Sequence, residues 1–148
     1  MSLEENKAIV RRFAEAINEK DLTALNDLMA PDFVDPDQQL RGLISFKKYE
    51  SMFIKGFPDM HLTIKDIIAK DDKVWVRIEV TMTHTREFRG IPPTGNKIKL
   101  KSFQIWRIAE GKIAERESQV WDFMDFFKQL GVIEYTEKGK QLFPEEAK

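Results

Sequence analysis

The chain has 148 residues, 42% of them hydrophobic and 33% charged, and its 24 Lys and Arg against 25 Asp and Glu leave a net charge of −1. This composition is typical of a soluble globular domain. It excludes disordered and collagen-like chains and gives no support for a nucleic-acid or membrane-surface partner. The lack of cysteine excludes disulfides, thiolate metal sites and a cysteine nucleophile, and only two histidines, His61 and His84, argue against a structural metal.

The sequence predicts neither a membrane span nor a signal peptide. No apolar run approaches the roughly 20 residues of a membrane span, and the first residues form a charged amphipathic segment unlike a signal peptide. We therefore expect a cytoplasmic protein. One domain is expected over residues 1–148, with its core at about 4–131 and a polar, fraying tail at 132–148.

The chain begins with a pattern typical of helices. Apolar residues at helical spacing, Phe13 and Ile17 among them, indicate a first helix, and Asp21 is placed to cap a short second one. Pro31 ends that pattern. Residues 32–35 are expected to be extended, because they run directly into a proline.

A third helix is expected to begin after Gly42 and to end at Gly56, just before Pro58. Tyr49 should face inward from it, where it would contact either a substrate or only the core. The apolar side of this helix is formed by Phe46, Tyr49, Phe53 and Phe57.

Residues 60–122 predict long strands. From Val74 to Thr83, apolar and polar residues alternate with a period of two, which indicates a strand with one buried face. A loop over Gly90–Gly95 leads to the next strand, and a tight turn then leads to a final strand over Lys112–Trp121. A short helix follows and stops at Gly131.

Helices followed by an antiparallel meander indicate an α+β fold rather than alternating βαβ units. Strands of about ten residues twist and curl strongly. Three N-terminal helices packed on the concave side of such a curved, mainly antiparallel sheet would form a cone with an internal pocket, with the short C-terminal helix beside it.

Several strings resemble the SnoaL-like polyketide (ester) cyclases, of the nuclear transport factor 2-like superfamily. The most specific stretch runs from Thr83-His84-Thr85 to the Pro92-Pro93-Thr94-Gly95 loop. The other matching strings, in chain order, are Asp32-Phe33-Val34-Asp35, Gly111-Lys112-Ile113, Trp121-Asp122 and Gln129-Leu130-Gly131. The resemblance implies the cone fold, a homodimer, and ring closure on a polyketide ester by intramolecular aldol condensation without metal or cofactor. It also implies an aspartate general acid/base at Asp122.

The sequence departs from the family pattern in four places. Pro36 replaces a frequent His, Arg86 replaces Gly after Thr-His-Thr, and Asp125 replaces Gly in the last helix. The stretch between Ile113 and Asp122 is one residue longer, which predicts a β-bulge. The added charges make a direct transfer of substrate identity unsafe.

Asp122 is the first catalytic candidate. A carboxyl in an apolar pocket has its pKa raised toward neutrality, so it can remove a proton from carbon and later return it. Trp121 and Phe123 would supply apolar surroundings. The alternative is that Asp122 caps the following helix, with Asp125 three residues on.

Polar residues on apolar strand faces are further candidates. Gln104 and Ser102 share a face with Trp106, and a buried polar side chain implies an internal hydrogen bond or a ligand, so we expect Gln104 and Trp106 to bind substrate. His84 ends an apolar strand face and is the second catalytic candidate, with a satisfied rim residue as the alternative. Asp35 should lie near the open end of the cone and bind substrate.

Three functions follow. The first is a cofactor-independent cyclase acting on a small apolar or acyl ligand. The second is a ketosteroid-isomerase-like or epoxide-hydrolase-like enzyme. A hydrolase of that kind needs two carboxylates and an arginine around one water, and Asp122, Arg107 and Glu117 are the nearby types. The third is a non-catalytic binding and dimerisation module. An apolar pocket with Asp122 facing inward would favour an enzyme.

The outer sheet face predicts a homodimer. Phe103 and Ile105 lie on the face of their strand opposite the predicted pocket, and exposed apolar groups of this kind favour a partner. Arg116 and Glu117 are expected at the rim of that interface. No metal, cofactor, nucleic acid or membrane is expected as a partner.

Overall fold

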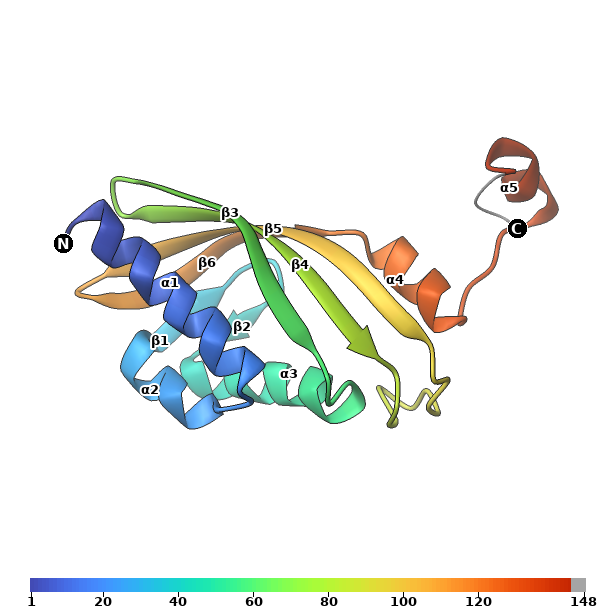
Figure 1. The fold of residues 1–148 in the computed structure, drawn as a ribbon, viewed down its shortest axis with the longest axis horizontal. Coiled ribbons are helices and arrows are strands. Elements are labelled where there is room, and N and C mark those ends of the chain that lie inside the picture. The colour runs from blue at the N-terminus through green and yellow to red at the C-terminus, as the bar shows by residue number, and fades with distance from the viewer. Residues whose placement is uncertain (145–148) are drawn as a thin grey trace.

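A computed structural model describes residues 1–144 and shows an α+β fold in which helices cover one face of a curved six-stranded sheet (Figure 1). The predicted α+β class is therefore correct. The helices are α1 (Leu3–Asn18), the short 3-10 turn η1 (Leu22–Ala24), α2 (Leu25–Leu28), α3 (Leu43–Gly56), α4 (Phe123–Leu130) and α5 (Glu137–Leu142). The strands are β1 (Met29–Asp35), β2 (Leu40–Arg41), β3 (His61–Lys70), β4 (Lys73–Thr83), β5 (Lys97–Ala109) and β6 (Lys112–Trp121).

The sheet is mixed. Its strand order is β2-β1-β6-β5-β4-β3, and β1 runs parallel to β6 while every other neighbouring pair is antiparallel. The three long strands β3, β4 and β5 curve over the N-terminal helices in Figure 1, and α1 and α3 lie beneath them. The expected extended segment at residues 32–35 is the end of β1.

The two longer N-terminal helices form where the apolar periodicity predicts them. Helix α1 buries Ile9, Phe13 and Ile17 on one side. Gly42 is the N-cap of helix α3; its φ of +86° is one that glycine adopts without strain, and its N–H donates to Phe33 O at 2.6 Å.

Aromatic rings fill the space between these helices and the sheet. Trp106 on β5 is fully buried, with its ring centroid 4.8 Å from that of Phe13 on α1. Phe33 and Phe46 extend the cluster, at 5.0 Å from each other. This core fixes α1 and α3 against the sheet, so side chains that α3 directs toward the sheet are held in place.

Strand β6 has two irregularities that decide which of its side chains face inward. The neighbours Arg107 and Ile108 of β5 pair with Glu115 and Ile113, so Ala114 between them is an extra residue of β6. In the same way, Ile105 and Trp106 pair with Ser118 and Arg116, so Glu117 is a second extra residue. A one-residue slip turns the following side chains to the other face. As a result, Ile113, Arg116 and Gln119 all lie on the inner face although their spacing is odd, and the β-bulge predicted in this stretch is confirmed.

Three sequence predictions need correction. The second helix is only a 3-10 turn followed by four residues of α-helix, and the two-residue strand β2 was not predicted. The tail predicted to fray contains α5, which stands away from the sheet in Figure 1, while its last four residues lie outside the described part of the chain. Within residues 1–144, no helix is both long and apolar enough to cross a membrane.

Candidate active site

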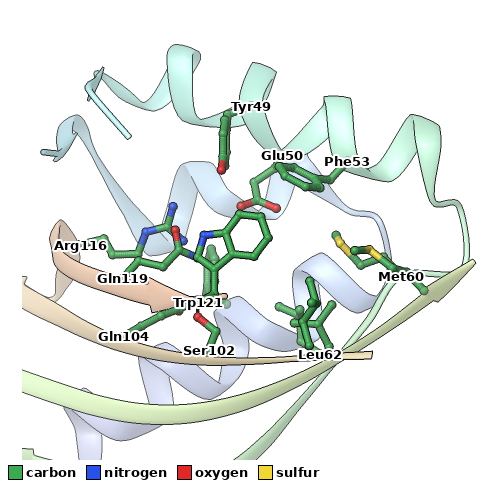
Figure 2. A pocket seen from close by; sticks show the side chains of 14 residues that line it. Tyr49, Glu50, Phe53, Met60, Leu62, Ser102, Gln104, Arg116, Gln119 and Trp121 are labelled. Atoms are coloured by element: carbon green, nitrogen blue, oxygen red, sulfur yellow. Dashed lines mark hydrogen bonds between the residues drawn. The ribbon is translucent and has the colours of Figure 1, made fainter. Parts of the chain in front are cut away.

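A cavity of about 80 Å³ lies between the helices and the inner face of the sheet (Figure 2). One side is apolar, and Figure 2 shows Met60 and Leu62 there. The opposite side is polar, with Tyr49 and Glu50 projecting from α3 and Arg116 and Gln119 from β6. The lining residues are Phe13, Tyr49, Glu50, Phe53, Met60, Leu62, Val80, Met82, Leu100, Ser102, Gln104, Arg116, Gln119 and Trp121.

A buried ion pair forms the base of the polar side. Arg116 Nε and Nη2 lie 2.7 Å and 2.5 Å from Asp35 Oδ2, and the two side chains are only 2% and 0% exposed. The guanidinium stacks over the rings of Phe46 and Trp106, at 5.5 Å and 5.2 Å. Asp35 Oδ1 also accepts from Gln38 N at 3.2 Å. The positive charge of Arg116 is therefore balanced inside the fold rather than offered to a ligand.

Glu50 is the carboxyl that lines the cavity. Burial raises the pKa of Glu50, and the negative charge of Asp35 acts in the same direction, while Arg116 and Lys20 oppose it. The carboxyl therefore holds a proton to higher pH than an exposed glutamate. A group that titrates closer to neutrality, beside apolar walls, can both remove and return a proton.

Tyr49 and the β1–β2 turn close the polar end. Tyr49 Oη donates to Gln38 Oε1 at 3.1 Å, and Gln38 Nε2 donates to Gln119 Oε1 at 3.5 Å. Burial raises the pKa of Tyr49 to about 12, so its hydroxyl stays protonated at neutral pH. Gln119 N also donates to Asp37 Oδ2 at 2.8 Å. The turn is thus attached to both α3 and β6.

Three buried polar atoms on the cavity's lining residues have no hydrogen-bond partner, and one of them, Arg116 Nη2, is in the ion pair with Asp35. Gln104 is 7% exposed; its Nε2 donates to Ser102 Oγ at 3.2 Å, while its Oε1 is unpartnered. Trp121 Nε1 is also buried and unpartnered. Gln104 and Tyr49, both expected to bind substrate, therefore lie at the same cavity, and Trp106 lies fully buried beneath the Arg116 guanidinium, outside the lining. Asp35 reaches the site through Arg116.

Asp122 lies elsewhere. It is exposed, it is not among the residues lining the cavity, and its Oδ1 accepts from Asp125 N at 2.9 Å as the N-cap of α4. The helix-cap interpretation is confirmed. The catalytic role that the family resemblance implies for Asp122 stays a prediction.

The cap predicts a specific pattern of stability. Asp122→Ala should lower the free energy of unfolding by about 1 kcal/mol, because it removes the acceptor for Asp125 N. Asp122→Asn keeps an oxygen at that position, so it should change stability little. Thermal unfolding of the two variants checks this, and an equal loss in both would contradict the cap.

His84 is also outside the cavity lining. It is fully buried, with Nδ1 3.0 Å from Thr94 Oγ1 and accepting from Thr94 N at 3.3 Å. Its ring lies 5.2 Å from that of Phe57, and its Nε2 has no partner. These contacts hold the loop that follows β4 against the body of the protein. A catalytic role for His84 stays a prediction.

Two central residues of the site were missed from the sequence, although signals for both are present. Glu50 falls four residues after Phe46 and three before Phe53, so it interrupts the apolar stripe of α3 with a carboxyl. Arg116 was expected at a dimer rim, and this is wrong, because the irregularity at Glu117 turns it to the inner face. Among residues 1–144, no cluster of three or more His, Asp or Glu residues could hold a metal ion.

The fold and site define a class of protein in which helices on a curved sheet surround a cavity with one apolar and one polar side. Comparisons with known proteins give the family. The chain belongs to the SnoaL-like polyketide cyclase family, whose model matches residues 7–130.

Individual relatives agree with this assignment. The chain is 25% identical over 136 residues to the aklanonic acid methyl ester cyclase AcmA of Streptomyces galilaeus, covering 87% of this chain and 92% of AcmA. Among solved structures, AclR, a candidate hydroxylase from Streptomyces galilaeus, is 30% identical with a TM-score of 0.80, over 89% of this chain and 99% of AclR. IdmH, a candidate polyketide cyclase from Streptomyces antibioticus, is 29% identical with a TM-score of 0.74, over 86% of this chain and 99% of IdmH.

Proposed function

We propose that this protein is a cofactor-independent cyclase-like enzyme that acts on a small acyl ligand by general acid/base catalysis in the cavity of Figure 2. The observation that carries the proposal is the carboxyl of Glu50, which lines a mostly apolar cavity and has a pKa raised by burial. Membership of the cyclase family and similarity to a methyl ester cyclase support the reaction class.

An aldol ring closure combines two proton transfers with the formation of one carbon–carbon bond. A base removes a proton from the carbon beside one carbonyl, the resulting enolate carbon bonds to a second carbonyl carbon, and the new alkoxide takes up a proton. We assign the base to Glu50. Its ionised carboxylate would accept the proton and then return it to the alkoxide, so one carboxyl group serves both steps. Trp121 Nε1–H, which has no partner within the fold, would orient a carbonyl oxygen.

The family resemblance implies the same role for Asp122, the sequence pattern adds His84 as a second candidate, and these assignments can be separated from that of Glu50. Asp122→Asn and His84→Gln remove the carboxyl and the imidazole of the two candidates outside the cavity lining. If Glu50 is the base, catalysis should survive in Asp122→Asn. A loss of catalysis in Asp122→Asn at unchanged melting temperature would favour Asp122 instead.

The function is tested by deuterium exchange. Methyl 3-oxobutanoate in D₂O at mildly acidic pD exchanges its C2 protons only after a base removes them, and NMR follows the loss of their signal. We expect the wild-type protein to accelerate this exchange above buffer at equal carboxylate concentration. No acceleration would contradict the enzyme proposal and would favour the non-catalytic binding module.

A hydrolase is a second candidate, favoured by one observation. Arg116, which lines the cavity, forms an ion pair with the buried Asp35 and interacts electrostatically with Glu50, and two carboxyls with an arginine are the groups that such water activation requires. These residues replace the Asp122, Arg107 and Glu117 set considered from the sequence. Diol formation from 1,2-epoxybutane, measured by gas chromatography, would support this candidate over the cyclase.

We also propose a homodimer through the outer face of the sheet. Phe103 and Val120 are paired across β5 and β6 and are 54% and 61% exposed. Phe103→Glu with Val120→Glu should convert a dimer into a 17.4 kDa monomer in light scattering at micromolar concentration. Ile44→Glu, at a 74% exposed position on α3, is the matched control and should leave the mass unchanged. A monomeric wild-type protein would contradict the dimer.

A further inference from the structure

Apart from Arg116 Nη2, which the Asp35 carboxylate neutralises, two polar atoms of the cavity lining have no partner, and they differ in kind. Trp121 Nε1–H can only donate a hydrogen bond and Gln104 Oε1 can only accept one. Buried polar atoms of native folds nearly always have a partner, so each exception calls for a water molecule or a ligand. A donor and an acceptor at one cavity define a complementary pair of groups on whatever occupies it.

Both atoms are held in place before any ligand binds. Trp121 pairs with Ser102, and Gln104 with Gln119, across two neighbouring strands, so all four side chains share the inner face. The Trp121 ring packs at 3.9 Å from that of Phe123. Figure 2 shows its indole between Tyr49 and Glu50 on one side and the strand carrying Ser102 and Gln104 on the other. The Gln104 amide is anchored by its 3.2 Å bond to Ser102, which leaves Oε1 as its free end.

The charges around the cavity disfavour an anionic ligand. Arg116 is the one cation among the described residues that line it, and Asp35 already balances its charge at 2.5 Å. Glu50 adds a carboxyl whose ionised form would repel a second carboxylate. A neutral carbonyl compound needs no counter-charge and is not repelled by Glu50.

We propose that the cavity selects uncharged ligands with a hydroxyl or enol two carbons from an ester or ketone carbonyl. Trp121 Nε1–H donates to the carbonyl oxygen, Gln104 Oε1 accepts from the hydroxyl, and the carbon chain lies toward Met60 and Leu62. The inference rests on the proposed function in one respect: a β-hydroxy carbonyl is the unit that an aldol closure creates. The volume of about 80 Å³ is roughly half that of an engineered cavity of ~150 Å³ that holds benzene, so the enclosed end of the ligand is short.

The test is a binding measurement that needs no turnover. Methyl 3-hydroxybutanoate is titrated into ¹⁵N-labelled protein, and the indole N–H signals of the three tryptophans are followed. The Trp121 signal, assigned from its loss in Trp121→Phe, should move. Trp75 alternates with the buried Val74 and Val76 on β4, so it faces the other side of the sheet, and its signal should stay in place.

Three comparisons give the expected selectivity. Sodium 3-hydroxybutanoate, at matched ionic strength, should bind about tenfold or more weakly than the ester. Methyl butanoate, which lacks the hydroxyl, should bind about 3–10-fold more weakly, the effect of one hydrogen bond. Gln104→Met should weaken the hydroxy ester by the same factor but leave methyl butanoate unchanged.

Each outcome bears on the inference separately from the proposed function. Three results would overturn the inference even if the wild-type protein catalyses C2 exchange. They are equal binding of the ester and the acid, a Trp121 signal that does not move, and an equal effect of Gln104→Met on the binding of both esters. Selective binding of the hydroxy ester without any exchange catalysis would support the inference and contradict the proposed enzyme.

Discussion

Glu50→Gln is expected to slow C2 exchange of methyl 3-oxobutanoate about 10²- to 10⁴-fold, the range typical of a lost general base. The amide keeps the size of the carboxyl, so the apolar wall and the neighbouring Tyr49 should be undisturbed. Asp122→Asn makes the same chemical change on a residue outside the cavity lining and is the matched control. Rates for both, measured at equal protein concentration, check the assignment; full activity in Glu50→Gln would end it.

The pH dependence of stability gives an independent check of Glu50. A carboxyl whose folded pKa is raised binds its proton more tightly in the folded state than in the unfolded state, so stability falls as pH rises from the unfolded pKa through the folded pKa. Glu50→Gln removes that loss. At neutral pH the melting temperature of the variant should therefore be a few degrees above that of the wild type. At a pH below the ordinary glutamate range the two melting temperatures should be equal.

Arg116→Met is expected to lower the free energy of unfolding by about 3–5 kcal/mol, which corresponds to roughly 10 °C in melting temperature for a domain of this size. The methionine fills the space between Phe46 and Trp106, so packing is largely kept. The buried carboxylate of Asp35, however, loses its counter-charge. Calorimetry of the variant measures the loss.

The double variant Asp35→Asn with Arg116→Met isolates the charge effect. Asn keeps an oxygen that can accept from Gln38 N while removing the negative charge. The double variant should therefore be more stable than Arg116→Met alone, a non-additivity expected for two residues in contact. If the loss of stability in the double variant equals the sum of the losses in Asp35→Asn and Arg116→Met, the destabilisation comes from lost packing.

The fold was predictable because its signals are local. The period-two alternation of Val74, Val76 and Ile78 gave β4, and Gly42 and Gly56 bounded α3. Tyr49 and Gln104 were placed correctly on the inner side for the same reason, since each lies on an element with a regular period. These predictions required only knowing which face of a single helix or strand is apolar.

The centre of the site depends on non-local facts. The contact of Asp35 with Arg116 joins residues 81 positions apart through the parallel pairing of β1 with β6, which no local pattern indicates. Arg116 was expected at the rim of an interface instead of inside the fold, and a period-two count along β6 could not correct this, because it does not register an extra residue. The cap geometry of Asp122 was readable from its position, whereas its absence from the cavity lining depends on the course of β6.

The two extra residues of β6 make chain length, rather than side-chain identity, the control on what lines the polar side of the cavity. If β6 paired regularly from Arg116 on, with no bulge at Glu117, the alternation would carry Gln119 and Trp121 to the outer face and bring Ser118 and Val120 inward. The bulge thus places an indole donor and an amide, rather than a hydroxyl and an isopropyl group, in the cavity lining. Deleting Glu117 would keep Gln119 and Trp121 inward, because it makes their spacing from Arg116 even, whereas deleting Val120 from the regular part of the strand would turn Trp121 outward. In this fold, the position of a deletion relative to the bulge therefore decides whether ligand preference changes.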